Sequence, residues 1–236
     1  MSKTAHVFLG DHLAIRSITA ILLLASVWFI PVDLRAQESA TSAQADQRKT
    51  STPYTGDLSI FDSPGRDQRL QIDRVMDMLG IKPGKTVADV GAGSGWFTVR
   101  AAKRVTGSGT VYAVDINPKA IEYIHHRAER EKLNNIKTIL GRSDNSLLPA
   151  NSVDSVLLLK TYHEVARPVE LLANLRQSLR SGARVGIIDR NGNGENHGIN
   201  KDVVIQEAGE AGYRLIEQAD FVKADDMDYF LIFAAK

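Results

Sequence analysis

The sequence predicts an α/β fold in which helices cover both faces of a doubly wound, mostly parallel sheet of seven strands. Between residues 86 and 211, short apolar runs alternate with stretches of helical periodicity. The runs up to residue 189 are continuously apolar, which suits parallel strands that are buried on both faces. Two further runs after residue 211 have no helix between them, so an antiparallel C-terminal strand is expected.

The order of the elements follows from these runs and from the residues that separate them. Strands are predicted over residues 87–90, 110–115, 136–140, 153–159, 184–189, 213–221 and 228–234. Helices are predicted over residues 66–79, 95–106, 118–133, 168–179 and 200–211. Pro118 and Pro168 stand at helix starts, where a missing N–H costs nothing, and Asn200 can cap the last helix.

Composition limits the classes of partner. The chain has 236 residues, enough for one sizeable domain, with 43% apolar and 24% charged residues. Of its 29 basic and 28 acidic residues, three and two precede residue 37, which leaves 26 of each sign beyond it. A neutral domain has no general attraction for a phosphate backbone, so a nucleic-acid partner is not expected. The absence of cysteine excludes disulfides and thiolate chemistry.

An apolar run of 13 residues, at positions 18–30, dominates the amino terminus. Arg16 precedes it, and Pro31 and a small-residue end at residues 34–36 follow it, which is typical of a secretory signal peptide. An uncleaved anchor or a buried helix is the alternative, although a membrane span needs ~20 residues. The protein is therefore expected to be exported, to the periplasm or the extracellular space, or anchored to the membrane by this segment.

Three regions follow from this reading. Residues 1–36 are the predicted signal peptide or membrane anchor. Residues 37–54 are polar and rich in Ser, Thr, Ala and Gln, which predicts a disordered linker. Residues 55–236 are the predicted folded domain.

A glycine-rich turn follows the first predicted strand of the sheet. The apolar run at residues 87–90 ends in glycines at alternate positions, Gly91, Gly93 and Gly95, and Asp89 lies two places before the first of them. The next apolar run ends in a second acid, Asp115. A strand, a glycine turn, a helix, a strand and an acid are the arrangement by which an open parallel sheet binds a nucleoside-bearing cofactor. The alternative is a turn that is tight only for folding.

The glycine spacing bears on which cofactor is bound. A dinucleotide fingerprint has a third glycine at its sixth position, so that the helix can lie close to the strand, but Trp96 stands there. A pyrophosphate also gains nothing from a carboxylate below its turn, whereas a ligand with a cationic amino group does. Asp89 can bind such an amine directly or through water, and Asp115 can accept from both hydroxyls of a ribose.

These motifs resemble those of class I S-adenosylmethionine-dependent methyltransferases, and the resemblance extends from Leu70 to the carboxyl terminus. VADVGAGSG, at residues 87–95, is similar to the first family motif, and VYAVDINP, at 111–118, to the second, whose acid binds the ribose. Residues 141–149 resemble the segment after the third strand, where an acid, here Asp144, contacts the adenine amino group. The resemblance implies that S-adenosyl-L-methionine is bound by the following residues: Asp89, Gly91, Ala92, Gly93, Gly95, Asp115, Ile116, Asp144, Asn145 and Lys160.

Methyl transfer requires an aligned nucleophile, exclusion of water and, for a poor nucleophile, removal of a proton. The segment after the fourth strand, residues 160–165, is expected to face the methyl group. His163 is its only side chain with a pKa ordinarily near neutrality, so it is the candidate catalytic base. Glu164 or Tyr162 can orient the substrate or hold His163. The alternative is that His163 and Glu164 only cap the loop before the next helix.

The remaining predictions concern the acceptor and other ligands. The loop at residues 189–198 is either a mobile lid, a substrate rim or a flexible surface connection. No metal site is expected, because neither Glu195 nor His197 has a second metal-ligating residue at the spacing of one helical turn. The expected function is methylation of a small molecule, with contact to a membrane only through the N-terminal segment if that segment is uncleaved. The alternatives are a cofactor-binding module without turnover and, less favoured by Trp96, a NAD-dependent oxidoreductase.

Overall fold

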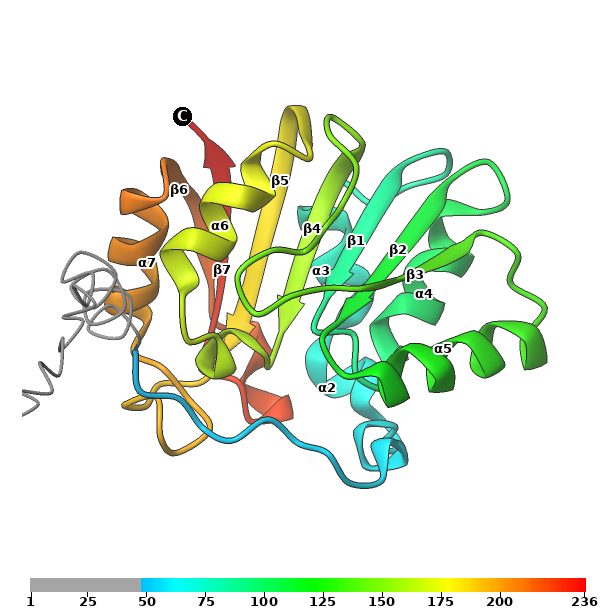
Figure 1. Ribbon diagram of the computed structural model, residues 1–236, viewed down its shortest axis with the longest axis horizontal. Helices are drawn as coiled ribbons and strands as arrows, with labels where there is room; N and C mark the ends of the chain where they lie inside the picture. The colour runs from blue at the N-terminus through cyan, green and yellow to red at the C-terminus, as the bar shows by residue number, and fades with distance from the viewer. Residues whose placement is uncertain (1–47) are drawn as a thin grey trace, which may run out of the picture. The chain divides into compact units, whose positions relative to one another are not determined.

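The computed structural model describes residues 48–236, which contain one seven-stranded sheet of order β3-β2-β1-β4-β5-β7-β6 (Figure 1). Strands β1 to β5 are parallel to one another, whereas β7 runs antiparallel to both of its neighbours. This confirms the predicted fold class. The strands are β1 (Thr86–Val90), β2 (Thr110–Asp115), β3 (Ile136–Leu140), β4 (Val153–Leu159), β5 (Leu179–Asp189), β6 (Tyr213–Ala219) and β7 (Tyr229–Ala235).

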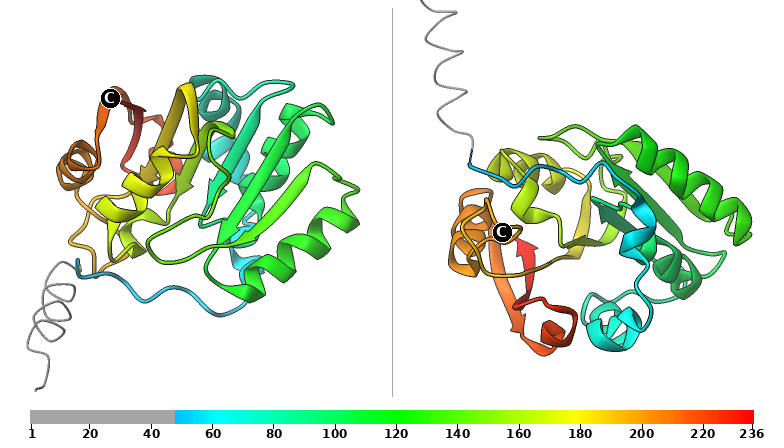
Figure 2. Two further views of the ribbon diagram at one scale, coloured as in Figure 1. Left: turned by 45° about the horizontal axis from the view of Figure 1, so that its top comes forward. Right: turned by 90° about the horizontal axis from the view of Figure 1, so that it is seen from below.

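Helices cover both faces of the sheet (Figures 1 and 2). The α-helices are α2 (Arg66–Leu70), α3 (Ile72–Met78), α4 (Trp96–Val105), α5 (Pro118–Arg130), α6 (Pro168–Arg176) and α7 (Lys201–Glu210). Three short 3₁₀ turns are η1 (Leu58–Phe61), η2 (Tyr162–Glu164) and η3 (Phe221–Asp225). As predicted, Pro118 and Pro168 open α5 and α6, and the Asn200 side chain accepts from the backbone N–H of residue 202 to cap α7.

Two apolar cores lie on opposite faces because neighbouring residues of a strand point in opposite directions. On β1, Ala88 and Val90 belong to the core that includes the buried leucines of α6. Val87, between them, belongs to the core that includes α3 and the first turn of α4. The central strands are therefore buried on both sides, which holds the sheet's carboxyl edge rigidly.

The single helix predicted over residues 66–79 is broken at Gln71, whose φ is 51°. Leu70 and Ile72 flank the break, and both are buried in the same core. Residues two apart in a continuous helix point about 200° away from each other. The break at Gln71 lets both side chains face the core, so the burial of Leu70 and Ile72 outweighs the preference of this segment for one continuous helix.

The predicted signal peptide or anchor, and the linker up to residue 47, lie outside the described residues. Residues 48–61, here called the N-terminal segment, cross the carboxyl ends of the parallel strands (Figures 1 and 2). The Arg48 guanidinium lies 2.8 Å from the Glu207 carboxylate on α7 and donates to the carbonyls of Tyr162 and Val165. Residues 48–54, which the sequence assigns to a disordered linker, are thus fastened to the domain. Among residues 48–236, no helix is long and apolar enough to cross a membrane.

Candidate active site

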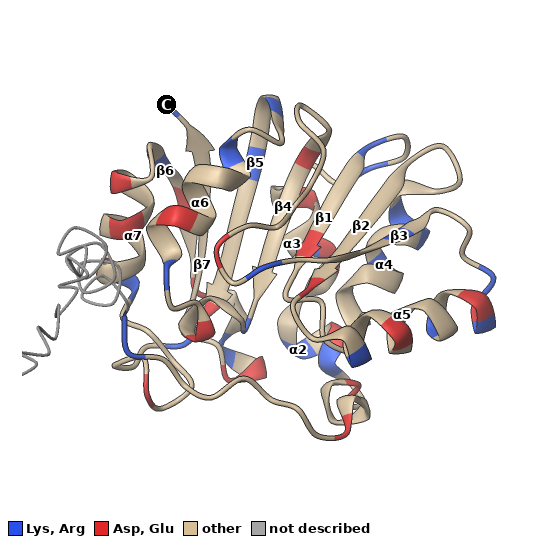
Figure 3. Cartoon of the chain, in the orientation of Figure 1, with Lys and Arg blue, Asp and Glu red and all other residues tan. Residues whose placement is uncertain are grey.

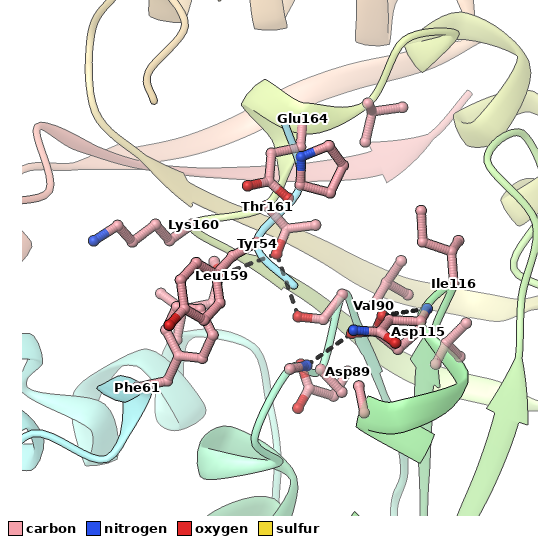
Figure 4. A pocket seen from close by; sticks show the side chains of 18 of the residues that line it. Tyr54, Phe61, Asp89, Val90, Asp115, Ile116, Leu159, Lys160, Thr161 and Glu164 are labelled. Carbon is pink, nitrogen blue, oxygen red and sulfur yellow. Dashed lines mark hydrogen bonds between the residues drawn. The ribbon is translucent and has the colours of Figure 1, made fainter. Parts of the chain in front are cut away.

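A cavity of about 760 Å³ lies at the carboxyl edge of the sheet (Figure 4). Its walls are the turn between β1 and α4, the ends of β2 and β4, the turn η2 and the N-terminal segment. Small-molecule sites have volumes of roughly 300–1,000 Å³, and in open α/β sheets they occur at this edge. Most of the predicted site residues line the cavity, namely Asp89, Gly91, Ala92, Gly93, Asp115, Ile116, Lys160, His163 and Glu164.

The glycine turn approaches the cavity with its backbone. Gly91 has a φ of 78°, and a Cβ added to it would overlap the Thr161 side chain. Gly93 has a φ of 54°, and a Cβ there would meet only Phe61, at 3.6 Å. Gly95 does not line the cavity, but it caps α4, where a Cβ would come within 3.0 Å of Ile124. The first two glycines therefore shape the cavity floor, and the third lets two helices approach each other.

Two acids at neighbouring strand ends face this floor (Figure 4). Asp89 is only 2% exposed and accepts a 2.6 Å hydrogen bond from the Thr98 hydroxyl. Burial raises the pKa of Asp89 to about 7, the Thr98 hydrogen bond opposes that rise, and the charge of Asp115 adds to it. Asp115 accepts from the backbone N–H groups of Gly93, at 2.8 Å, and Asn117, at 2.9 Å. These bonds fix its carboxylate and leave lone pairs for a ligand.

Besides Gly95, two predicted cofactor residues, Asp144 and Asn145, do not line the cavity. The Asp144 carboxylate is 3.2 Å from the Arg167 guanidinium, and the Asn145 side chain accepts from the backbone N–H of residue 147. In this segment Arg142, Ser143 and Ser146 line the cavity instead. Contact of Asp144 with a cofactor would require it to leave Arg167, so this role stays a prediction. The side chain of Lys160 extends away from the two acids (Figure 4).

His163, the candidate base, is held by a buried carboxylate. Its Nδ1 lies 2.9 Å from both oxygens of Asp189, which is fully buried at the end of β5. Asp189 also accepts from the backbone N–H groups of His163 and Arg190. A carboxylate can only accept, so Nδ1 carries the proton and Nε2 of the neutral ring keeps a lone pair.

The hydrogen-bonding partner of the His163 ring is thus Asp189, rather than Tyr162 or Glu164. Tyr162 is completely buried, and its hydroxyl donates to Glu207, on α7, at 2.9 Å. Glu164 lies on the other side of the imidazole, with an oxygen 3.8 Å from Nε2 of His163. Burial raises the pKa of Glu164 to about 7, the charge of His163 lowers it and the nearby carboxylates of Asp115 and Asp189 raise it.

Several residues that line the cavity do not belong to any of the predicted motifs. Tyr54 and Phe61, on the N-terminal segment, meet edge to face with ring centroids 5.5 Å apart and form an apolar wall. Arg190 and His197 reach the cavity from the loop after β5, which therefore forms part of its rim. The sequence does indicate that Asp189 lies near the site, because it is a third acid, after Asp89 and Asp115, at the end of an apolar strand. Nothing in the polar sequence around Tyr54 marks it as a lining residue.

Trp96, which argues against a dinucleotide, is built into the core beside the site. Trp96 is 3% exposed, and the guanidinium groups of Arg66 and Arg100 lie 4.5 Å and 3.9 Å from the centroid of its ring. Arg66 is held in turn by Asp225, with a 3.0 Å ion pair. The ring therefore occupies the volume next to the first turn of α4, where a dinucleotide fingerprint has a glycine.

The sequence is similar to known methyltransferases. The family described as "methyltransferase domain" matches residues 81–220, more than half of the chain. The protein-L-isoaspartate O-methyltransferase of Pyrococcus horikoshii is 28% identical over 95 residues, which cover 40% of this chain and 42% of that protein. The ribosomal protein L11 methyltransferase of Burkholderia mallei is 31% identical over 109 residues, which cover 45% of this chain and 32% of that protein. The chain thus spans less than half the length of these curated relatives.

Solved structures share the fold. A SAM-dependent methyltransferase from Aquifex aeolicus has a TM-score of 0.69 at 24% identity, covering 76% of this chain and 98% of that one. Fibrillarin from Aeropyrum pernix, solved with natively bound S-adenosyl-L-methionine, has a TM-score of 0.52 at 15% identity, covering 69% of this chain and 74% of that one. The fold, the cavity at its carboxyl edge and the family match agree: the chain belongs to the methyltransferase domain family.

Proposed function

We propose that this protein is an S-adenosylmethionine-dependent methyltransferase that acts on a small-molecule acceptor. The observation that carries the proposal is a single cavity with two chemically different ends. One end has a glycine turn between two acids, Asp89 and Asp115, and the other has a carboxylate-held imidazole, His163. The first suits a cofactor with an amino group and a ribose, and the second suits an acceptor that must lose a proton.

The cofactor end fits S-adenosylmethionine through its donors and acceptors. Ionised Asp89 would pair with the cationic amino group, and the turn at Gly91 and Gly93 lets the backbone come close. Asp115 retains lone pairs for two ribose hydroxyls. Ile116, which is 50% exposed at the cavity wall, offers apolar surface to the flat base. When bound, the cofactor supplies a methyl group that its sulfonium charge activates for in-line displacement.

At the acceptor end, the residues of this chain position a nucleophile and take its proton. Nε2 of His163 is the acceptor atom for that proton, and Asp189 stabilises the imidazolium that results. The apolar wall of Tyr54 and Phe61 would shield one side of the bound reactants from water. A base positioned in this way contributes about 10²–10⁴-fold to the rate.

Calorimetric titration tests the cofactor assignment. S-adenosylmethionine should bind with one site per chain, and NAD should not bind. Asp115→Asn should weaken binding of S-adenosylmethionine, because one of the two carboxylate oxygens that would accept from the ribose hydroxyls is replaced by an NH₂ donor. Tight NAD binding without S-adenosylmethionine binding contradicts the proposal and supports the oxidoreductase alternative.

Labelled S-adenosylmethionine, incubated with fractionated small molecules from cell extract, tests turnover. His163→Ala should lower methyl transfer about 10²–10⁴-fold and leave cofactor affinity nearly unchanged. His125→Ala is the matched control, because that imidazole is exposed on α5 next to Glu129. If the cofactor binds but no fraction accepts label, the protein is a binding module. If His163→Ala retains full turnover, the assignment of the base is wrong.

The proposal extends to partners and location. Lys and Arg are interspersed with Asp and Glu on the helices in Figure 3, which supports a small-molecule substrate over a nucleic acid. The apolar run at residues 18–30 supports export or membrane anchoring. Amino-terminal sequencing of the native protein tests this point: a chain that starts after residue 36 is exported and processed, and one that keeps the run is anchored or retained.

A further inference from the structure

The geometry points to a site for a divalent transition metal, formed by His163, Glu164 and His197 at the acceptor end of the cavity. Each residue offers one ligand atom, and the three atoms lie within 4.8 Å of one another. Within residues 48–236, no other set of three His, Asp or Glu side chains converges in this way. Two imidazoles and one carboxylate are a donor set that Zn²⁺ and Fe²⁺ use in proteins.

The first ligand is preset by the residue behind it. Asp189 accepts from Nδ1 of His163 and thereby turns Nε2 toward Glu164, 3.8 Å away. Metal-bound histidines almost always donate their other ring N–H to a carboxylate or carbonyl, which fixes the tautomer and the orientation of the ring. The same lone pair that qualifies His163 as a base qualifies it as a ligand, and here the supporting carboxylate is 0% exposed.

The third ligand comes from a distant loop that is fastened at several points. The backbone N–H of His197 donates to the Ser51 hydroxyl at 2.8 Å, and its carbonyl accepts from the Arg190 guanidinium at 2.7 Å. The Ser51 hydroxyl donates in turn to the Gly194 carbonyl at 2.9 Å. His197 has a φ of 56°, which is unusual for a side-chain-bearing residue and persists only where surrounding contacts impose it.

These contacts bring the second imidazole against the first. The rings of His163 and His197 meet nearly perpendicular, with centroids 5.8 Å apart. Metal–nitrogen and metal–oxygen bonds of about 2.0–2.2 Å place the ligand atoms of a tetrahedral site roughly 3.3–3.6 Å apart. The ligand atoms, which lie within 4.8 Å of one another, therefore need to move closer by at most about 1.2–1.5 Å. His197 is exposed, so rotation of its side chain can supply this without moving the core.

Three protein ligands leave at least one coordination position open to the cavity. The role of that position rests on the proposed function: it would bind the oxygen of an acceptor hydroxyl. The cation stabilises the oxyanion, so the O–H bond breaks with its proton passing to solvent. The oxygen then forms a bond to the methyl carbon as the carbon–sulfur bond breaks, and S-adenosylhomocysteine leaves. With a metal in place, His163 is a ligand and the cation replaces it as the group that ionises the acceptor.

Cobalt(II) provides a direct probe, since its visible absorption reports its ligands. Co²⁺ added to the untagged, chelator-treated full chain should give one absorbing site per chain, and Zn²⁺ should abolish the band. His197→Ala and Glu164→Gln should each weaken Co²⁺ binding at least 10-fold, and Asp189→Asn about 10–100-fold. His125→Ala, on the exposed face of α5, should have no effect.

A missing band, or an affinity unchanged in His197→Ala, overturns the metal site. His197→Ala is chosen because its side chain is exposed and its backbone contacts remain, and circular dichroism confirms that it folds. Titration with S-adenosylmethionine in the presence of chelator separates the two proposals. Cofactor binding without Co²⁺ binding overturns only the metal site, whereas Co²⁺ binding without cofactor binding overturns only the proposed methyltransferase function.

Discussion

Binding of S-adenosylmethionine should release a proton from Asp89 near neutral pH. This carboxyl is 2% exposed, and burial raises its pKa to about 7. A cationic amino group can pair only with the ionised form, so a protonated Asp89 must lose its proton when the cofactor binds. Cofactor affinity should therefore rise with pH up to about 7 and then level off.

The size of the effect follows from the pKa. At pH 6, a carboxyl with a pKa of about 7 is protonated in about nine-tenths of the molecules, so affinity should be ~10-fold below its high-pH limit. That factor corresponds to about 1.4 kcal/mol. Close to one proton should be released per cofactor bound at pH 6, and only about a tenth of one at pH 8. These figures refer to Asp89 alone: the α-amino group of the ligand titrates near pH ~8 and would take up about half a proton on binding at that pH, so proton release is compared at pH 6 and 7.

Calorimetry at pH 6, 7 and 8, in buffers of different ionisation enthalpy, measures affinity and proton release together. The Thr98 hydroxyl donates to Asp89 and lowers the pKa of that carboxyl. Thr98→Val removes this hydrogen bond, so the pKa of Asp89 and the rise in cofactor affinity should both move to higher pH. Asp89→Asn should bind weakly and release no proton at pH 6, which isolates the titration of the ligand. Affinity that is flat between pH 6 and 8 in the unaltered protein, with no proton release, would refute the reasoning.

Three further substitutions, two of them paired with a control substitution, test the packing and chemistry around the cavity. Gly91→Ala should lower the free energy of unfolding by roughly 2–5 kcal/mol, because its left-handed backbone would be strained and its new Cβ would overlap the Thr161 side chain. Gly182→Ala, with a φ of 76° and open space, should cost only about 1–2 kcal/mol in the same thermal denaturation. Arg48→Ala should cost about 1–3 kcal/mol and speed proteolysis of the N-terminal segment, whereas Lys49→Ala, whose ion pair is exposed, should change neither. Asp189→Asn should reverse the imidazole tautomer and lower turnover about 10²–10⁴-fold at unchanged cofactor affinity. Equal losses of stability in Gly91→Ala and Gly182→Ala, or in Arg48→Ala and Lys49→Ala, would contradict the packing arguments. Full turnover in Asp189→Asn would contradict the role of Asp189 in orienting the imidazole.

The sheet could be predicted because its determinants are local. Apolar runs define the central strands β1 and β4 and the second half of β5, and turn residues separate the strands from the helices. The break at Gln71 could not be predicted, because it depends on which face the core offers to Leu70 and Ile72. That information belongs to the packed helices and strands, and it overrides the helical periodicity of the segment.

The cofactor end of the site was more predictable than the acceptor end. Asp89 lies near the end of one apolar strand and Asp115 ends the next, so their position at the sheet edge is a matter of topology. The contacts of His163 are not local, since its partner Asp189 lies 26 residues away at the end of β5. Arg48 is a stronger case, because its partner Glu207 is 159 residues distant and the intervening sequence gives no hint of the pair.

The position of β7 in the sheet governs when the acceptor end can form. β7 lies between β5 and β6, and its first residue, Tyr229, is paired in register with Asp189. The carboxylate that orients His163 therefore gains its flanking strand only after about 40 more residues have been synthesised. Orientation of the proposed base is thereby tied to completion of the domain, because the strand beside Asp189 is the last one in the sequence.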